Sequence, residues 1–253
     1  MPRVLCWLPL LAACQAPQSQ TGMSHFDPGS WGHAFAVQLQ RPDQLAIETT
    51  LLATTIGLTH RDHTIQQELN EDRIITEGST KNGDGVAVGL GVLAGISSAA
   101  KWIGGDRGRD AEVLLESFVL TDGVTEILKH TARRQRPGSD NKDSFPSGHT
   151  SFAFAMATYL QRSWTADHEG FTGALGYLAY APALYVGIDR IEADKHWPTD
   201  VAFGAFLGVL LTNVVFDVHY GDAKRPGLFG VRGLALEPHA REDGAELALV
   251  LRF

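Results

Sequence analysis

From residue 43 to residue 218 the chain is a succession of segments whose apolar residues recur at helical spacing, and no other sequence feature restricts the fold as strongly. Between Asp110 and Thr131, for example, Val113, Leu114 and Phe118 follow this spacing. We also predict helices over 43–59, 86–103, 150–164, 172–188 and 198–218, which are rich in apolar residues, and a more polar helix over 64–75, with a loop over 79–85. We therefore predict an all-α fold, a helical bundle of about six core helices.

The C-terminal part has a different periodicity. Leu234 and Leu236, and later Leu247, Leu249 and Leu251, alternate with smaller or polar residues, and a polar stretch separates the two sets. Alternation with a period of two is typical of strands. We expect a small β-hairpin over about 230–253, within one domain that covers residues 26–253.

Three apolar runs approach the length of a membrane span: Val86–Ala100, Phe171–Ile188 and Val201–Phe216. Each is at or below the ~20 residues that a span needs. Other segments carry carboxylates such as Glu48 and Glu116, and a charge in lipid costs roughly 2.5 kcal/mol or more. These observations favour a water-soluble bundle over a partly embedded one.

The N-terminus has the pattern of a secretory signal. A short basic start precedes the apolar run Val4–Ala13, and the stretch that ends at Cys14 resembles a bacterial lipobox. We predict a signal peptide over 1–13 and a lipidated tether over 14–25, which would anchor the chain on the periplasmic side of a bacterial envelope. Gln15, rather than Asp, slightly favours the outer membrane. The alternative is an unlipidated secreted chain with an incidental cysteine.

A first cluster of charges lies at the end of the predicted helix 110–131. Lys129 and Arg136 are two helical turns apart, and Pro137 predicts that the helix ends there. Both side chains would project from the same helix end. The alternative interpretation is a basic last turn that complements the helix dipole.

A second cluster is Pro146-Ser147-Gly148-His149, which directly precedes the apolar run of the helix over 150–164. Free N–H groups at a helix N-terminus can bind an anion, and glycine allows close approach. The His149 imidazole can exchange a proton near neutral pH. The alternative is a serine cap beside a surface histidine.

A third cluster runs from Arg190 through His196 to Pro198 and Asp200. Pro198 suits the first turn of a helix, which places Asp200 within reach of His196. A carboxylate bonded to one ring nitrogen makes the other nitrogen more basic. The alternative is a capping aspartate and an unrelated histidine.

Taken together, the clusters supply three cations, a helix N-terminus, two histidines and a carboxylate in a chain of net charge −8. This set suits transfer of a phosphoryl group, with a nucleophile on one side and an acid on the other. The acidic balance argues against a nucleic-acid partner. A zinc site is disfavoured because the sequence has no His-Glu-x-x-His motif.

The spacing Lys129-x6-Arg136-Pro137, Pro146-Ser147-Gly148-His149 and Arg190-x5-His196-x3-Asp200 resembles the three signature motifs of the type 2 phosphatidic acid phosphatase family. Its superfamily includes bacterial acid phosphatases and vanadium haloperoxidases. The motifs follow in the right order, and the resemblance is strict from residue 129 to residue 200. One position departs, because Asp189 stands where the family usually has serine, which puts the affinity for phosphate in doubt.

The resemblance implies a role for each residue. His196 would attack phosphorus, Asp200 would orient it, and His149 would protonate the leaving group and then activate water. The phosphoryl oxygens would be bound by Lys129, Arg136, Ser147, Gly148 and Arg190.

We therefore expect a metal-independent phosphatase without a cofactor. It would act on phosphomonoesters or pyrophosphates, either phosphorylated lipids or small esters, through a phosphohistidine. Two alternatives remain open at this point: a vanadate-dependent haloperoxidase, with vanadate held by the same cations, and a non-catalytic envelope lipoprotein that binds phospholipid.

Overall fold

The computed structural model describes residues 28–38, 41–71, 82–168, 170–220, 233–241 and 244–252. Its helices are α1 (Pro28–Gln38), α2 (Pro42–Leu58), α3 (Asp62–Glu71), α4 (Asn82–Ile103), α5 (Arg109–Ala132), α6 (Gly148–Thr165), α7 (Gly170–Ala174), the 3-10 helix η2 (Leu175–Ala179), α8 (Tyr180–Glu192) and α9 (Pro198–Tyr220). The predicted all-α class is confirmed. The predicted signal peptide, Cys14 and the tether up to residue 25 lie outside the described residues.

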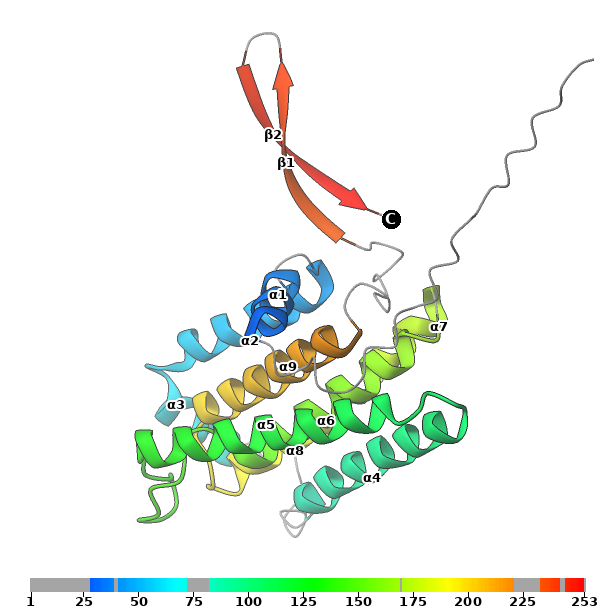
Figure 1. Cartoon of the computed structure of the whole chain (residues 1–253). Coiled ribbons are helices and arrows are strands. Elements are labelled where there is room, and N and C mark those ends of the chain that lie inside the picture. Colours follow the sequence, from blue (N-terminus) through cyan, green and yellow to red (C-terminus); the bar gives the residue numbers. More distant parts are fainter. Residues whose placement is uncertain are drawn as a thin grey trace, which may run out of the picture.

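Helices α6 and α9 form the centre of the bundle, with α1 and α2 on one side and α4 on the other (Figure 1). The contact between them is close because α9 has glycines at the crossing. A Cβ on Gly208 would lie 2.8 Å from the backbone nitrogen of Ala155, and one on Gly204 would lie 2.8 Å from the Ser147 carbonyl oxygen. Small residues therefore bring the start of α9 against the start of α6.

The structure divides the helix predicted over 172–188 into three parts. Residues 170–174 are α-helical, 175–179 form the 3-10 helix, and α8 begins at Tyr180. Pro182 accounts for the break, because it has no N–H to donate to the carbonyl of Leu178 one turn earlier. The proline lies instead in the first turn of α8, where that donor is not needed.

Helix α4 begins earlier than the sequence predicts. Residues 82–85 were expected in a loop, but they form the first turn of α4. Gly83 packs so closely on α8 that a Cβ there would lie 2.9 Å from Nη2 of Arg190. The loop prediction was wrong for residues 82–85, because Gly83, a residue type that usually breaks helices, serves here for close packing.

Strands β1 (Gly233–Arg241) and β2 (Gly244–Arg252) pair antiparallel, with Leu234 opposite Leu251 and Leu236 opposite Leu249. They lie where the sequence predicts the hairpin.

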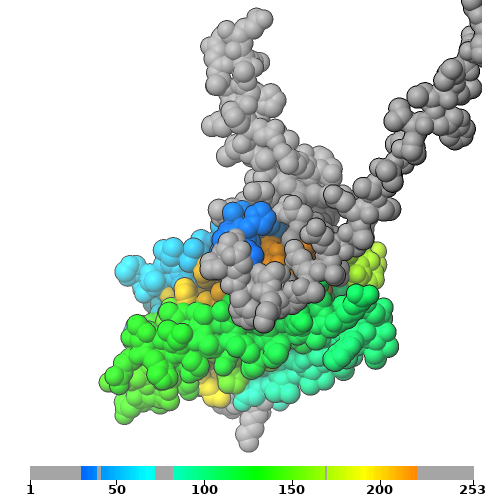
Figure 2. Space-filling view, viewed as in Figure 1, coloured from blue at the N-terminus to red at the C-terminus, as the bar shows by residue number. Residues whose placement is uncertain are grey.

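Three helical segments are long and apolar enough to cross a membrane: Asn82–Ile103, Gly170–Glu192 and Pro198–Tyr220. The first has 22 residues and the other two 23 each, which exceeds the apolar runs read from the sequence. Large apolar side chains are exposed on α4, α5 and α7–α8, including Val88, Ile96, Trp102, Ile103, Leu115, Ile127, Phe171 and Leu178. Helices α4 and α5 make up much of the face shown in Figure 2. These findings support association with a membrane and do not support the expected water-soluble bundle.

Two of the carboxylates that argued against a membrane, Glu48 and Glu116, have partners within the protein. Glu48 is buried and accepts hydrogen bonds from Gln38 at 2.6 Å and from Asn213 at 3.0 Å. Glu116 lies 2.9 Å from Nε2 of His219. A paired and buried carboxylate such as Glu48 is shielded from lipid, so the objection that rested on this residue loses its force.

Candidate active site

Residues from all three sequence clusters meet where α6 and α9 begin and α5 and α8 end. Lys129 is in the last turn of α5, His149 in the first turn of α6 and Arg190 in the last turn of α8. Backbone bonds join the segments: the Ser147 N–H donates to the Asp200 carbonyl at 3.0 Å, and the His196 N–H to the Arg190 carbonyl at 3.3 Å. The three motifs therefore converge at one end of the bundle.

The imidazole of His196 is buried, with 3% of the residue exposed. Its Nδ1 lies 2.6 Å from the carbonyl oxygen of Ser144. A carbonyl can only accept a hydrogen bond, so Nδ1 carries the proton and Nε2 keeps its lone pair. Burial lowers the pKa of His196 to about 3, although the bond to Ser144 opposes this, and the charges of Arg136 and Lys129 lower it further. The ring is therefore neutral near neutral pH, as a nucleophile requires.

The expected direct contact between Asp200 and His196 is replaced by an indirect one. The Asp200 carboxylate accepts a hydrogen bond from the Ser144 hydroxyl at 2.5 Å and one from the Trp197 N–H at 2.9 Å. Since the carbonyl of the same Ser144 binds His196, Asp200 acts on the ring through the backbone of residue 144. The sequence could not reveal this, because Ser144 lies outside the three motifs.

Arg134 is a further site residue that sequence reasoning missed. Its Nη1 donates to Asp200 at 2.6 Å and to the Thr199 hydroxyl at 2.6 Å, and its Nη2 donates to Asp62 at 2.5 Å. Asp62, in the first turn of α3, also accepts the Thr199 N–H at 2.9 Å. Arg134 thus compensates the buried charge of Asp200 and ties α3 to the start of α9. The sequence signal that could have identified Arg134 as a site residue is its position inside the first motif, between Lys129 and Arg136.

His149 faces a carboxylate that the sequence placed in a loop. Nε2 of His149 lies 3.1 Å from Oδ1 of Asp84, and Nη1 of Arg190 donates to the same oxygen at 2.6 Å. Burial lowers the pKa of His149, as do Arg190, Lys195 and Lys129, whereas Asp84 raises it. Half of the His149 side chain stays exposed, so it is open to a ligand from solvent.

Asp189, which departs from the family pattern, is completely buried beside Arg190. Its Oδ2 accepts hydrogen bonds from Nε of Arg190 at 3.0 Å and also from Nη2. Arg190 therefore presents only part of its hydrogen-bonding edge to a ligand, and its orientation is set by Asp189. The residue that departs from the family pattern therefore acts directly on a predicted phosphate ligand.

The remaining predicted phosphate-binding residues lie around the start of α6. Lys129 packs against Gly148, because a Cβ on this glycine would lie 3.0 Å from the lysine Nζ. The Ser147 hydroxyl lies 2.9 Å from the hydroxyl of Thr150 and is buried. Arg136 is close enough to lower the pKa of His196. The structure thus brings these predicted cations to the nucleophile side of the site.

No group of three or more His, Cys, Asp or Glu residues in the described part of the chain could hold a metal ion. Lys129, Arg136 and Arg190 bring positive charge to this site, and Lys129 also pairs with Glu126 at 2.5 Å. An anionic ligand with several oxygens suits such a set of donors.

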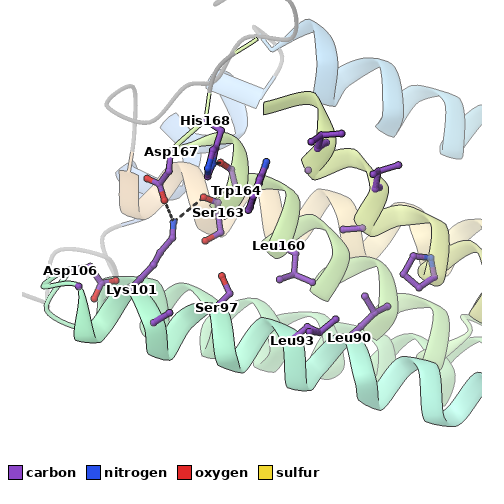
Figure 3. Close-up of a pocket in the computed structure, with 17 residues that line it drawn as sticks. Leu90, Leu93, Ser97, Lys101, Asp106, Leu160, Ser163, Trp164, Asp167 and His168 are labelled. Atoms are coloured by element: carbon purple, nitrogen blue, oxygen red, sulfur yellow. Dashed lines mark hydrogen bonds and ion pairs between the residues drawn. The ribbon is translucent and has the colours of Figure 1, made fainter. Parts of the chain in front are cut away.

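A groove of about 1000 Å³ lies away from this cluster (Figure 3). Its walls come from the second half of α4, the end of α6 and the segment 175–182, with Leu90, Leu93 and Leu160 on the apolar side. At its polar end Lys101 pairs with Asp167 at 2.9 Å. Lys101 follows Asp84 by several turns along α4, so the groove and the candidate active site occupy different ends of that helix.

Comparisons with known proteins find a family match over the region that contains the three motifs. Residues 111–223 match the model of the PAP2 superfamily. The lipid A 1-phosphatase of Porphyromonas gingivalis is 35% identical over 94 residues, which cover 37% of this chain and 20% of that protein. The probable lipid phosphate phosphatase 4 of Arabidopsis thaliana is 31% identical over 104 residues, or 38% of this chain and 30% of the relative. The matched region is thus less than a third of the length of either relative.

A solved structure supports the fold. The chain resembles the transmembrane PAP2 type phosphatidylglycerolphosphate phosphatase of Bacillus subtilis with a TM-score of 0.51 and 22% identity. The likeness covers 68% of this chain and 93% of that one.

Proposed function

Since residues 111–223 match the model of the PAP2 superfamily, we propose that the protein is a metal-independent phosphatase that hydrolyses phosphomonoesters or pyrophosphates of lipids. The observation that carries the proposal is the buried, neutral His196, which presents the lone pair of Nε2 among the charges of Lys129 and Arg136. Both relatives are named as phosphatases of lipids, and together with the apolar helices this favours a lipid over a small soluble ester.

In the first step, Nε2 of His196 attacks phosphorus while the bond from phosphorus to the leaving oxygen breaks. The leaving oxygen takes a proton from His149, and a phosphohistidine forms. The positive charge that develops on the His196 ring is stabilised by its Nδ1–H bond to the Ser144 carbonyl. Asp200 contributes by holding Ser144 in place.

In the second step, water attacks the phosphohistidine and gives a proton to His149, which is now neutral. The bond between phosphorus and Nε2 breaks, phosphate leaves, and both histidines return to their starting states. Lys129, Arg136 and Arg190 bind the phosphoryl oxygens through both steps, together with the Gly148 N–H at the start of α6. Ser147 supports this end of α6 through its bond to Thr150.

The proposal extends to where the enzyme works. Lipidation of Cys14 and a site on the periplasmic side of the envelope, with the outer membrane favoured, rest on the sequence of residues 1–25. The exposed apolar surface of α4 and α7–α8 supports a location at a membrane.

The test is phosphate release from a panel of lipid and soluble phosphate esters in the presence of EDTA. Removal of a catalytic nucleophile costs several orders of magnitude, so we expect His196→Ala to lose at least about 10³-fold in kcat. His168→Ala is the matched control, because this exposed histidine lies at the far end of α6. A loss smaller than about 10-fold in His196→Ala would exclude the phosphohistidine mechanism.

A further inference from the structure

Asp84 connects two residues to which the proposed mechanism gives different tasks. A single oxygen, Oδ1, accepts a hydrogen bond from Nη1 of Arg190 at 2.6 Å and lies 3.1 Å from Nε2 of His149. Asp84 comes from the first turn of α4 and precedes residues 111–223, which match the PAP2 model. None of the three motifs contains it.

The contact determines which part of the His149 ring a substrate can meet. The two ring nitrogens point in different directions, so a ring with Nε2 against the Asp84 carboxylate presents Nδ1 to the other side. A histidine held in this way by a carboxylate cannot turn freely, and its proton stays directed at one place. Asp84 is thus the carboxylate that pairs with this half-exposed imidazole in the described part of the chain.

Asp84 also opposes the other charges that act on His149. Burial and the cations Arg190, Lys195 and Lys129 lower the pKa of His149, and Asp84 is the acidic group that raises it. A general acid must carry its proton when the leaving group departs. A carboxylate at this place therefore limits the fall in the pKa of His149 in a site whose cations attract a phosphate anion.

Close packing of α4 on α8 places Asp84 beside Arg190 and His149. Gly83 precedes Asp84, and a side chain there would overlap Asp189 and Arg190. Because residue 83 has no side chain, the first turn of α4 reaches the end of α8, and the next residue meets both Arg190 and His149.

We propose that Asp84 is a positioning residue for the acid–base step: its carboxylate holds the His149 ring with Nδ1 toward the leaving oxygen. The proposal rests on the proposed phosphatase function and adds to it a residue outside the three motifs. Arg190, through its bond to the same oxygen, fixes the carboxylate.

The test compares two substrates in Asp84→Asn. An alkyl phosphate such as phosphatidic acid needs a proton on its leaving oxygen, whereas p-nitrophenyl phosphate has a stable leaving anion. We expect kcat to fall about 10- to 100-fold for the alkyl ester and less than about 3-fold for the aryl ester. The alkaline limb of the pH profile should move to lower pH, because loss of the carboxylate favours the neutral imidazole.

Two controls isolate the effect. Glu112→Gln removes an exposed carboxylate at the opposite end of the bundle and should leave both rates unchanged. In a His149→Ala background, Asp84→Asn should cause no further loss on the alkyl ester, because the group that it positions is gone. Asp84→Glu, which keeps the charge, should retain more alkyl phosphatase activity than Asp84→Asn.

Three outcomes would overturn the proposal. Equal losses on both esters with an unmoved pH profile would mean that Asp84 has only a structural role. A lower KM with unchanged kcat would mean that the carboxylate merely competes with phosphate for Arg190. A further loss in the His149→Ala background would show that Asp84 acts elsewhere. If the wild type releases no phosphate from either ester, the proposed function fails instead.

Discussion

At the scale of single residues, the site depends on compensation of buried charge. Asp200 has no exposed surface, and its three donors are Arg134, Ser144 and the Trp197 N–H. Ser144 joins this carboxylate to His196, since its hydroxyl binds one and its carbonyl the other. Loss of any of these donors would leave a buried acceptor unsatisfied and also loosen the nucleophile.

Arg134→Ala tests this compensation. Removing one partner of a buried ion pair is costly, but the Arg134 side chain is 35% exposed, so we expect a loss of about 2 kcal/mol in the free energy of unfolding. Thermal unfolding in detergent would show this as a lower Tm, together with lower phosphatase activity. Arg133→Ala is the control because Arg133 is an exposed neighbour at the end of α5. Equal Tm values for the two variants would contradict the structural role of Arg134.

The pH dependence of the wild type follows from the two histidines. His196 has a pKa of about 3 and stays neutral above that pH, so it does not limit the rate in the neutral range. His149 has a pKa below its ordinary value of 6.5 and must be protonated to act as the acid. As pH rises through this lowered pKa, the imidazolium is lost and kcat for alkyl esters should fall. A kcat that stays constant up to pH 8 would show that His149 is not the acid.

At the scale of elements, helix ends rather than helix faces build the site. Residues from the starts of α4, α6 and α9 and from the ends of α5 and α8 meet there. The position of each helix along its axis is therefore as important as its packing face. Glycines control this position where two helices touch most closely, as Gly83 does between α4 and α8.

Gly83→Ala, with Gly85→Ala as its matched control, tests whether the close contact of α4 with α8 is required for activity. A Cβ at residue 83 would overlap Asp189 and Arg190, whereas one at residue 85 meets nothing within 4 Å. We expect Gly83→Ala to shift the start of α4 and to lower kcat/KM at least about 10-fold. Gly85→Ala should keep its activity and gain up to about 1 kcal/mol of stability from helix propensity. Similar activities for the two variants would show that the contact of α4 with α8 is not required.

At the scale of the whole molecule, polar groups lie inside the bundle and apolar side chains face outward on several helices. Arg162 is buried and binds Asp217 at 2.8 Å and Asn213 at 2.9 Å, while Ile103 and Leu178 are exposed. Buried polar side chains with partners and an apolar exterior suit a protein in contact with lipid. The helices themselves, in addition to any lipid anchor, would then hold the chain at the membrane.

Attachment through the predicted lipid anchor can be separated from attachment through the apolar helices. The variant for this test has residues 1–14 replaced by a cleavable signal peptide without a lipobox. Because α4 and α7–α8 expose apolar surface, we expect the unlipidated chain to stay in the membrane fraction after an alkaline carbonate wash. The chain with its native N-terminus serves as the control. Release of the unlipidated chain into the soluble fraction would mean that the anchor alone provides attachment.

The sequence by itself determined the helical class, most helix positions and the three motifs of the site. These are local properties: helical periodicity is repeated within each segment, and each motif spans only a few residues. The bounds of α2, α5, α6 and α9 differ from the prediction by a few residues at most. Each motif also marks a helix end, which is a local property of the sequence. In the structure these helix ends meet at one end of the bundle, so the predicted residues from Lys129 to Asp200 lie together there.

Only the tertiary structure decided which residues from outside the motifs complete the site. These residues are Asp62, Asp84 and Ser144, which are separated in sequence from the groups that they bind. The residues next to them in the sequence form no motif that would predict these contacts. The tertiary structure also decided whether the carboxylates within the helices oppose a membrane, because a charge is costly or harmless according to the side of the helix that it occupies. Glu48 points into the bundle and has partners there, a fact that depends on packing and therefore could not be read from composition.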